Sequence, residues 1–282
     1  MPHGPKLLTA LGLAPISIYY ALLFVGSIGI FLAYSFYRFE DFDFVPAFQL
    51  GNYGDVLGSE LYQTLILRTL LLALAVSVVV VTVSYTFVYL INFVFARHRA
   101  LLYFLVLVSL FSGYLVRIYA WRTLLGAQGV VNEALLTIGL IDRPLRFLLN
   151  GWFAVGVALV NFMIPLAVLP LHAAMANVSP KTLEAARDLG AGPVTIFRQV
   201  LLPLTRGGIV VAFAFVFIAS AADVVTPTLL GGVQAQMVGT AVQAQFGTTF
   251  DWPFGAALSF TLMAVVLAVV ATFGWTMKAA TR

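Results

Sequence analysis

The residues whose types and spacing suggest chemistry gather between positions 184 and 203, which read EAARDLGAGPVTIFRQVLLP. This polar, helix-forming segment lies between two long apolar stretches. Ser179-Pro180 is typical of a helix start, Gly190 of a helix end about three turns later, and Gly192-Pro193 of a second start. This pattern indicates a docking element, because a short exposed helix presents charges and small side chains to another protein.

A second candidate is an ionisable residue in apolar surroundings. Asp223 lies late in the apolar stretch 207–226. Charged groups at membrane depth are costly and usually functional. The carboxylate could meet the ammonium group of a cationic substrate on a translocation path. Alternatively, it could pair with Arg117 or Arg122 and have a structural role only.

Two aromatic residues are further candidates for the substrate path. Tyr119 and Trp121 could offer cation–π faces to an amine on the substrate path. They could equally belong to the aromatic belt at the membrane surface.

Several other chemistries are excluded by what the sequence lacks. The chain has no cysteine, so it forms no disulfide or thiolate metal site. It has no GxxxxGK[ST] segment and cannot bind ATP in the usual way. No nucleophile–base set or metal-ligand cluster is present, and His172 has no partner at ligand spacing. We therefore expect neither an enzyme nor a metal site, and no cofactor in this chain.

Composition places the chain in a membrane. Hydrophobic residues make up 62% of its 282 positions and charged residues 9%, against about 25% in soluble domains. A helix needs about 20 apolar residues to cross the hydrocarbon core. Six stretches meet this requirement, so the fold class predicted is an all-α membrane protein. They are residues 13–36, 63–92, 101–125, 150–178, 207–226 and 254–277.

The first stretch follows Lys6 and is too long for the apolar core of a signal peptide, so we interpret it as a retained anchor helix. Six crossings put both termini on one side. With the termini in the cytoplasm, nine of the 15 Lys and Arg residues are inside, which agrees with the positive-inside rule. Residues 179–206 then face the cytoplasm. The net charge of +4 is too small to indicate nucleic-acid binding.

We expect residues 1–282 to form a single transmembrane domain. Its first outer loop, 37–62, is acidic and aromatic, and is either a solvated loop with an aromatic belt or a surface for an external partner. The loop 117–150 contains helix-like pieces around 130–139. The loop 223–253 closes with Asp251 and Trp252 in a turn that is either structural or part of a docking face. No internal repeat supports an inverted-repeat secondary transporter.

The polar segment resembles the EAA loop of ABC-importer permeases. That pattern is EAA, three residues, Gly, nine residues, an aliphatic residue, any residue, Leu and Pro. All spacings match, with Val in place of the more usual Ile. The matching residues are Glu184, Ala185, Ala186, Gly190, Val200, Leu202 and Pro203.

The resemblance to permeases of spermidine/putrescine-type ABC importers extends over much of the chain. It is carried by residues 115–121, 131–144, 184–191, 223–232 and 250–259. It implies a type I importer membrane domain in a bacterial inner membrane, with a cytoplasmic coupling helix between helices 4 and 5. It also implies a second, homologous permease, two copies of a cytoplasmic ATPase that binds ATP and Mg, and a periplasmic solute-binding protein.

Within the coupling helix, residue types suggest roles. Ala185 and Ala186 give a smooth surface that a cleft in the ATPase can approach. Glu184 places a negative charge toward the helix N-terminus, where the dipole favours it. Gly190 permits the sharp turn. Arg187, Asp188 and Pro203 complete the set that we expect to transmit the ATPase's motion.

The function predicted is ATP-driven import of a small organic solute by alternating access, with spermidine or putrescine as substrate. The alternative substrates are γ-aminobutyrate or another small amine or amino-acid derivative. An ATP-independent secondary transporter or channel, or a non-transporting membrane scaffold, would leave the EAA spacing unexplained.

Overall fold

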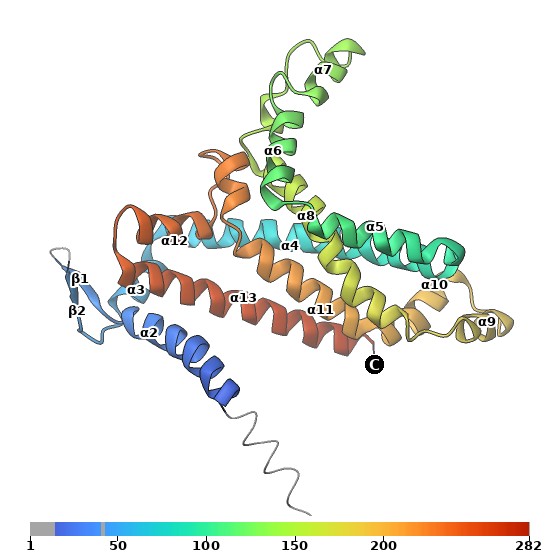
Figure 1. Cartoon of the computed structure of the whole chain (residues 1–282), viewed down its shortest axis with the longest axis horizontal. Helices are drawn as coiled ribbons and strands as arrows, with labels where there is room; N and C mark the ends of the chain where they lie inside the picture. Colours follow the sequence, from blue (N-terminus) through green and yellow to red (C-terminus); the bar gives the residue numbers. More distant parts are fainter. Residues whose placement is uncertain (1–14, 41–42, 282) are drawn as a thin grey trace, which may run out of the picture. The chain divides into compact units, whose positions relative to one another are not determined.

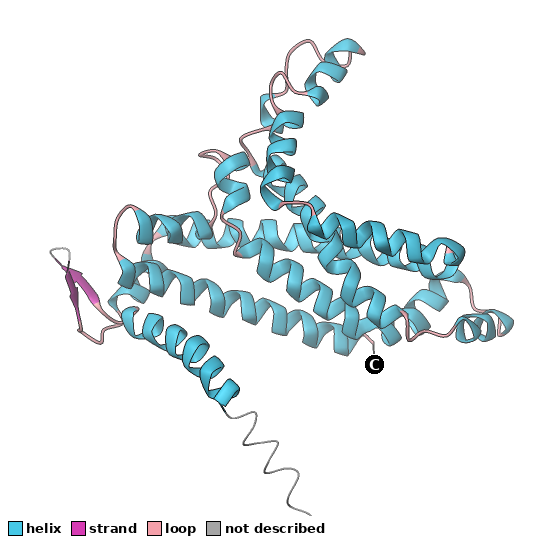
Figure 2. Cartoon of the chain, viewed as in Figure 1, coloured by secondary structure: helices cyan, strands magenta, loops and turns pink. Residues whose placement is uncertain are grey.

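The computed structural model describes residues 15–40 and 43–281, and these are almost entirely helical (Figure 2). Lys6 and Arg282, which entered the topology count, lie outside the described residues. The helices are α2 Ser27–Tyr34, α3 Gly51–Gly58, α4 Glu60–Tyr89, α5 Arg99–Phe111, α6 Tyr114–Leu125, α7 Val130–Thr137, α8 Trp152–Met175, α9 Pro180–Asp188, α10 Pro193–Ile196, α11 Leu202–Ala221, α12 Val238–Gly247 and α13 Trp252–Ala280. The strands are β1 Arg38–Glu40 and β2 Asp43–Val45.

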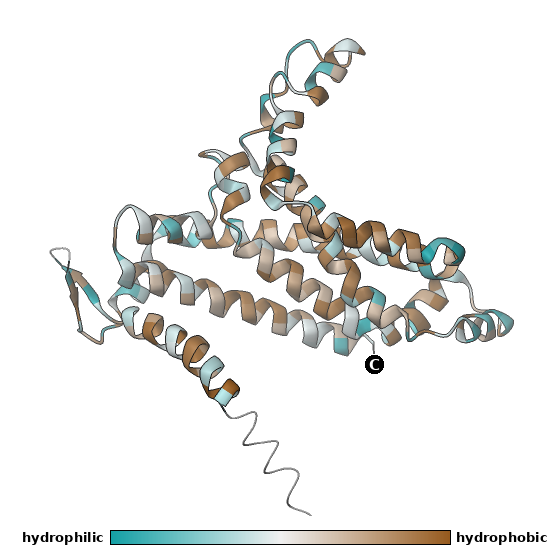
Figure 3. Ribbon diagram, viewed as in Figure 1, coloured by the Kyte–Doolittle hydropathy of each residue, from teal (hydrophilic) through white to brown (hydrophobic). Residues whose placement is uncertain are grey.

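Five helical segments are long and apolar enough to cross a membrane, and a bent pair of helices would make a sixth crossing. Apolar residues run along these helices, while α9 is largely polar (Figure 3). The six-crossing, all-α fold class is therefore confirmed. The single spans are Pro15–Tyr34, Glu60–Val94, Trp152–Met175, Pro193–Ala221 and Trp252–Ala280, and the bent pair is Ala96–Phe111 with Tyr114–Thr137.

The third crossing is not the continuous helix expected over 101–125. The chain leaves helical geometry at Ser112 and Gly113, and the two halves meet at 90° (Figure 1). Glycine is a poor helix former in water, but apolar membrane helices often contain it. For that reason composition alone did not mark the break.

The fifth crossing also differs from expectation at both ends. It is continuous from Pro193 to Ala221, because α10 passes through a π-helical turn into α11. It then ends before Asp223, which we had placed inside the stretch 207–226. A separate π-helical turn follows at Pro227–Gly231.

The described chain divides into two compact units, one comprising residues 64–240 and 263–282. Its core is the pair α8 and α11, with buried Val155, Leu159, Leu171 and Val216. At Gly208 the two helices come so close that a Cβ would lie 2.8 Å from the Pro170 carbonyl oxygen and would meet Ala174. A small residue is therefore required there, as in many membrane helix pairs.

The other unit comprises residues 1–63 and 241–262. Its two strands pair antiparallel, with Phe39 opposite Phe44. Asn52 of α3 donates from Nδ2 to the carbonyls of Ser35 and Tyr37, at 2.9 and 2.8 Å. These bonds fix α3 against the end of the first span and so position the hairpin.

Candidate functional site

The first candidate site is the segment 179–203 between α8 and α11. Ser179 is extended and precedes Pro180 in the first turn of α9, as the sequence predicts. The Ser179 side chain makes no capping bond, and its carbonyl instead accepts the Thr182 amide at 3.0 Å. Glu184 falls beyond the first turn, where the helix dipole has little effect, so the expected dipole stabilisation is wrong.

The C-terminus of α9 is closed by a glycine turn. Gly190 has φ +81°, in the left-handed region, as the sharp turn requires. The Gly190 amide donates to the Arg187 carbonyl at 2.8 Å, and the Ala191 amide to the Ala186 carbonyl at 3.0 Å. This pair of bonds is the Schellman motif. The fixed spacing between the EAA residues and the glycine therefore places the end of α9 two residues before Gly190.

Only one face of α9 is used inside the chain. Leu183 is buried against Val178, Ile196 and Leu201. The opposite side exposes the motif side chains, and the apolar Leu189 is 89% exposed. The exposed members are Glu184, Ala185, Arg187 and Asp188, whereas Ala186 is half-buried. This face carries charged, small and apolar groups with no ion pair among the described residues.

Pro203 joins this segment to the membrane helix. It is half-buried in the first turn of α11, directly after the π-helical turn Phe197–Leu201. A proline inside a helix removes one hydrogen bond and crowds the carbonyl four residues earlier, and a π turn relieves both problems. The helix therefore continues unbroken from the exposed loop to Ala221, so a displacement at α10 moves a rigid rod.

The second candidate site is centred on Asp223. The Tyr114 hydroxyl donates to Asp223 Oδ1 at 2.6 Å and lies 2.7 Å from Thr226 Oγ1. The amides of Val225 and Thr226 also donate to the Asp223 carboxylate, at 3.3 and 3.2 Å. Asp223 thus caps the turn that follows α11. Among the described residues it makes no ion pair with Arg117 or Arg122, so the arginine partner expected as the alternative is not found.

The break between α5 and α6 is held from both sides. Arg117 of α6 donates from Nη2 to Ser109 Oγ of α5 at 3.1 Å, across the break. Its guanidinium lies 5.6 Å from the ring centre of Phe162, and the Tyr114 ring lies 4.4 Å from the same ring. Sequence reasoning missed Tyr114, Ser109 and Phe162. The only local signal was the glycine at 113, next to Tyr114.

Tyr119 and Trp121 are not brought together with Asp223. On α6, Trp121 shares a face with Tyr114, because seven residues make two turns, whereas Tyr119 points elsewhere and is 53% exposed. Trp121 instead lines an apolar groove of about 520 Å³ together with Trp152 and Asn161. Among the described residues, the hydrogen bonds to the Asp223 carboxylate come from Tyr114, Val225 and Thr226, and none comes from Tyr119 or Trp121.

In the other unit, Asp251 caps α13. Its Oδ1 accepts the Phe254 amide at 3.0 Å, and burial raises the pKa of its carboxyl above 3.8, although this hydrogen bond opposes the rise. The ring of Trp252 lies 5.8 Å from that of Phe44 on the hairpin. These contacts favour the structural interpretation of the Asp251–Trp252 turn.

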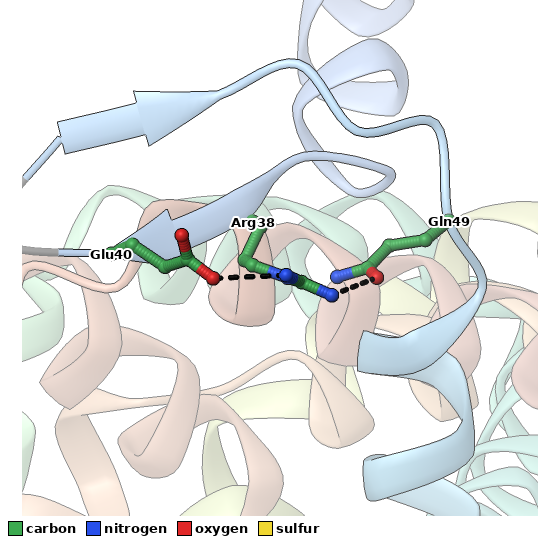
Figure 4. A network of polar contacts seen from close by, with 3 residues as sticks. All are labelled: Arg38, Glu40 and Gln49. Carbon is green, nitrogen blue, oxygen red and sulfur yellow. Dashed lines mark hydrogen bonds and ion pairs between the residues drawn. The ribbon is translucent and has the colours of Figure 1, made fainter.

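The hairpin carries the one ion pair found in the described residues. Figure 4 shows Arg38 between Glu40 and Gln49, with bonds of 2.9 Å to each. Both charged side chains are about half exposed, so the pair adds little stability, about 0–1 kcal/mol. Glu40 and Asp43, the acidic residues described on the strands, are both exposed.

Comparison with known proteins gives consistent results. Residues 93–276 match the family model described as binding-protein-dependent transport system inner membrane component. The spermidine/putrescine transport system permease protein PotB of Escherichia coli is 34% identical over 233 residues, covering 82% of this chain and 84% of the relative.

Two further similarities extend this result. The inner membrane ABC transporter permease protein YdcU of Escherichia coli is 31% identical, over 94% of this chain and 88% of the relative. A solved bacterial ABC transporter involved in import of the acidic polysaccharide alginate has a chain with a TM-score of 0.73 at 20% identity, covering 98% of this chain and 96% of that one. The structural match supports the fold.

Proposed function

Because this chain belongs to the family of binding-protein-dependent transport system inner membrane components, we propose that it carries a polyamine, spermidine or putrescine, across the membrane. It is a multi-pass permease subunit of an inner-membrane ABC importer and is not itself catalytic. Systems of this family include an ATPase and a periplasmic binding protein.

The observation that carries the transport mechanism is the exposed face of α9. The side chains of Glu184, Ala185, Arg187 and Asp188 are exposed and make no ion pair within the described residues, and Leu189 is almost fully exposed. Such a face is suited to a cleft in the ATPase. Because Pro193–Ala221 is one continuous helix, closure of the ATPase pair would tilt α11 and change access to the path.

The proposal extends to the topology of the chain and the composition of the complex. We place the EAA segment and both termini in the cytoplasm, with two ATPase copies below and a second, homologous permease beside this chain. A PotC permease of Haemophilus influenzae is 32% identical over 88 residues, 31% of this chain and 34% of the relative, so a related partner permease is reasonable. Residues 1–282 would act as one membrane domain.

For the substrate path we propose Asp223 and Trp121. Trp121 lies two turns beyond Tyr114, the partner of Asp223, on the same face of α6. Within the described residues Asp223 Oδ2 accepts a single hydrogen bond, from the Thr226 amide, so it retains lone pairs for an ammonium group. Trp121 and Trp152 offer aromatic faces in the neighbouring groove. Tyr119 is exposed on another face of α6 and contributes only if the partner permease covers it.

On the outer face we propose that the acidic hairpin meets the solute-binding protein. Asp43 and Phe48 are exposed there, and Phe48 is held at φ +44°. A residue other than glycine in this region is unusual and often marks a functional surface.

The test is ATPase activity of the complete importer in proteoliposomes, titrated with its binding protein. The panel is spermidine, putrescine, γ-aminobutyrate and neutral amino acids. Stimulation by spermidine or putrescine at the lowest concentration is the expected result. Stimulation by γ-aminobutyrate alone would replace the polyamine assignment, and uptake that persists without the ATPase would overturn the ATP-driven mechanism.

A further inference from the structure

A cavity of about 410 Å³, with four polar side chains in a lining that is otherwise apolar, lies where three membrane helices end beside the EAA segment. Asn92 comes from the end of the span that contains α4, Arg99 and Tyr103 from α5, and His172 from α8. None of these residues belongs to the substrate path or to the exposed face of α9. No acidic side chain lines the cavity.

The side chains of this cavity are arranged as donors. Arg99 and Tyr103 are four residues apart and share one face of α5. Asn92 Nδ2 donates to the Tyr103 hydroxyl at 2.7 Å, which leaves the hydroxyl proton for another acceptor. The ring of His172 packs against that of Tyr103, with centroids 3.9 Å apart.

Two of these groups lack partners among the residues that the structure describes. The Arg99 side chain makes no hydrogen bond or ion pair there. His172 Nδ1 is buried and has no hydrogen-bond partner. His172 Nδ1 is thus a buried polar atom that the described chain leaves without a partner, and the exposed Arg99 lines the same cavity with no carboxylate beside it in the lining.

We propose that this cavity binds the phosphate group of an anionic phospholipid from the leaflet beside the EAA segment. The guanidinium fork of Arg99 matches two phosphate oxygens. Arg99 stands at the first residue of α5, near the end of a crossing, which is the depth of lipid headgroups. Phe93 and Met175 also line the cavity and offer apolar contacts to the glycerol and upper acyl chain.

The bound lipid would also touch the coupling segment. Val178 and Pro180 line the cavity, and Val178 packs against Leu183 of α9. Occupancy therefore fills the space behind the start of α9 and steadies its position. ATPase coupling should then depend on the lipid.

The test is native mass spectrometry of the complete importer in mild detergent, titrated with phosphatidylglycerol, phosphatidylcholine, inorganic phosphate and glycerol 3-phosphate. Arg99→Gln is compared with Arg97→Gln, which removes the same charge two residues away and outside the cavity lining. We expect phosphatidylglycerol binding to weaken about tenfold or more in Arg99→Gln and less than about twofold in Arg97→Gln. Arg99→Lys should be intermediate, because it keeps the charge and loses the fork.

Equal losses in the two glutamine variants would overturn the proposal and indicate only surface attraction. Saturable binding that phosphatidylcholine matches would overturn the preference for an anionic lipid. Displacement by inorganic phosphate at the same concentration as lipid would overturn a lipid as the source of the phosphate. None of these measurements requires transport, so their failure is distinguishable from failure of the polyamine assignment.

Discussion

The EAA segment and the Asp223 cluster are both polar regions in an apolar chain, but they differ in whether their polar side chains are hydrogen-bonded within the chain. On α9, Glu184, Arg187 and Asp188 are exposed and unpaired. Around Asp223, the side chains of Tyr114, Asp223 and Thr226 are joined by hydrogen bonds through the Tyr114 hydroxyl. Groups left unpaired on a surface are available to another protein, whereas groups satisfied inside hold two helix breaks in place.

The comparison has a consequence for mutations. Changes on α9 should alter coupling and leave the chain folded, because its charged side chains are exposed and make no ion pair within the described residues. Changes in the Asp223 cluster should alter stability as well, because a buried group that loses its partner is costly.

The largest effect is expected from Glu184→Lys. Reversing this charge at a docked interface should cost about 2 kcal/mol or more, which lowers transport about 30-fold. Substrate uptake and ATPase stimulation in proteoliposomes measure this. Thr182→Lys also introduces a lysine on α9, about half a turn away, although it changes the net charge by one unit and not two, and serves as the control. Wild-type uptake in Glu184→Lys would remove α9 from the coupling path.

Asp223→Asn should come next. The amide oxygen can still accept the Tyr114 hydroxyl, so assembly should change little, but the charge that meets a cationic substrate is lost. We expect spermidine uptake to fall about tenfold, corresponding to about 1.4 kcal/mol. Asp251→Asn is the control, since Asp251 is also a capping carboxylate. Unchanged uptake in Asp223→Asn would leave Asp223 with a structural role only.

Gly190→Val tests the turn that ends α9. A β-branched side chain at φ +81° costs about 1–2 kcal/mol, so the end of α9 should fray and the ratio of transport to ATP hydrolysed should fall several-fold. Gly190→Asn should retain most coupling, because asparagine tolerates the left-handed region. If both variants lose coupling equally, the cause is a steric clash between the new side chain and the ATPase, and not backbone strain.

Tyr114→Phe tests the other region. It removes the hydroxyl shared by Asp223 and Thr226, and we expect the free energy of unfolding to fall by about 1–3 kcal/mol. The matched change Tyr119→Phe removes an exposed hydroxyl and should have little effect. Thermal unfolding of the purified complex compares them. Equal stability of the two variants would contradict a role for Tyr114 in holding the break.

The smallest effect is a pH dependence from Asp251. Because burial raises the pKa of the folded carboxyl, its contribution to stability is fully present below the ordinary pKa of 3.8 and is lost as pH rises through the raised value. Asp251→Asn should remove this dependence, whereas Asp43→Asn on the exposed hairpin should not. Unfolding temperatures measured across the acidic range test it, and identical profiles for wild type and Asp251→Asn would contradict it.

Much of the coupling segment could be predicted because its structure depends on near neighbours. The Schellman bonds join Ala191 to Ala186 and Gly190 to Arg187, all within one turn and a half. The spacing of proline and glycine therefore fixes where α9 begins and ends. The capping bond expected of Ser179 did not form, because its position allowed a backbone bond instead.

The break at Gly113 and the end of α11 at Ala221 were not predicted. Both lie in stretches apolar enough to cross a membrane as single helices. Hydropathy sums over a window and cannot detect a residue that leaves the helix when tertiary partners satisfy the freed groups.

The sequence by itself determined the number of crossings, the exposed polar helix and its ends, because apolar length and hydrogen bonds between near neighbours are local properties. Only the tertiary structure decided the partners of Asp223. Tyr114 lies 109 residues away and reaches the carboxylate only because the chain bends by 90° at the preceding residues. A side chain's partner at that separation depends on how helices pack, and packing is a property of the whole fold.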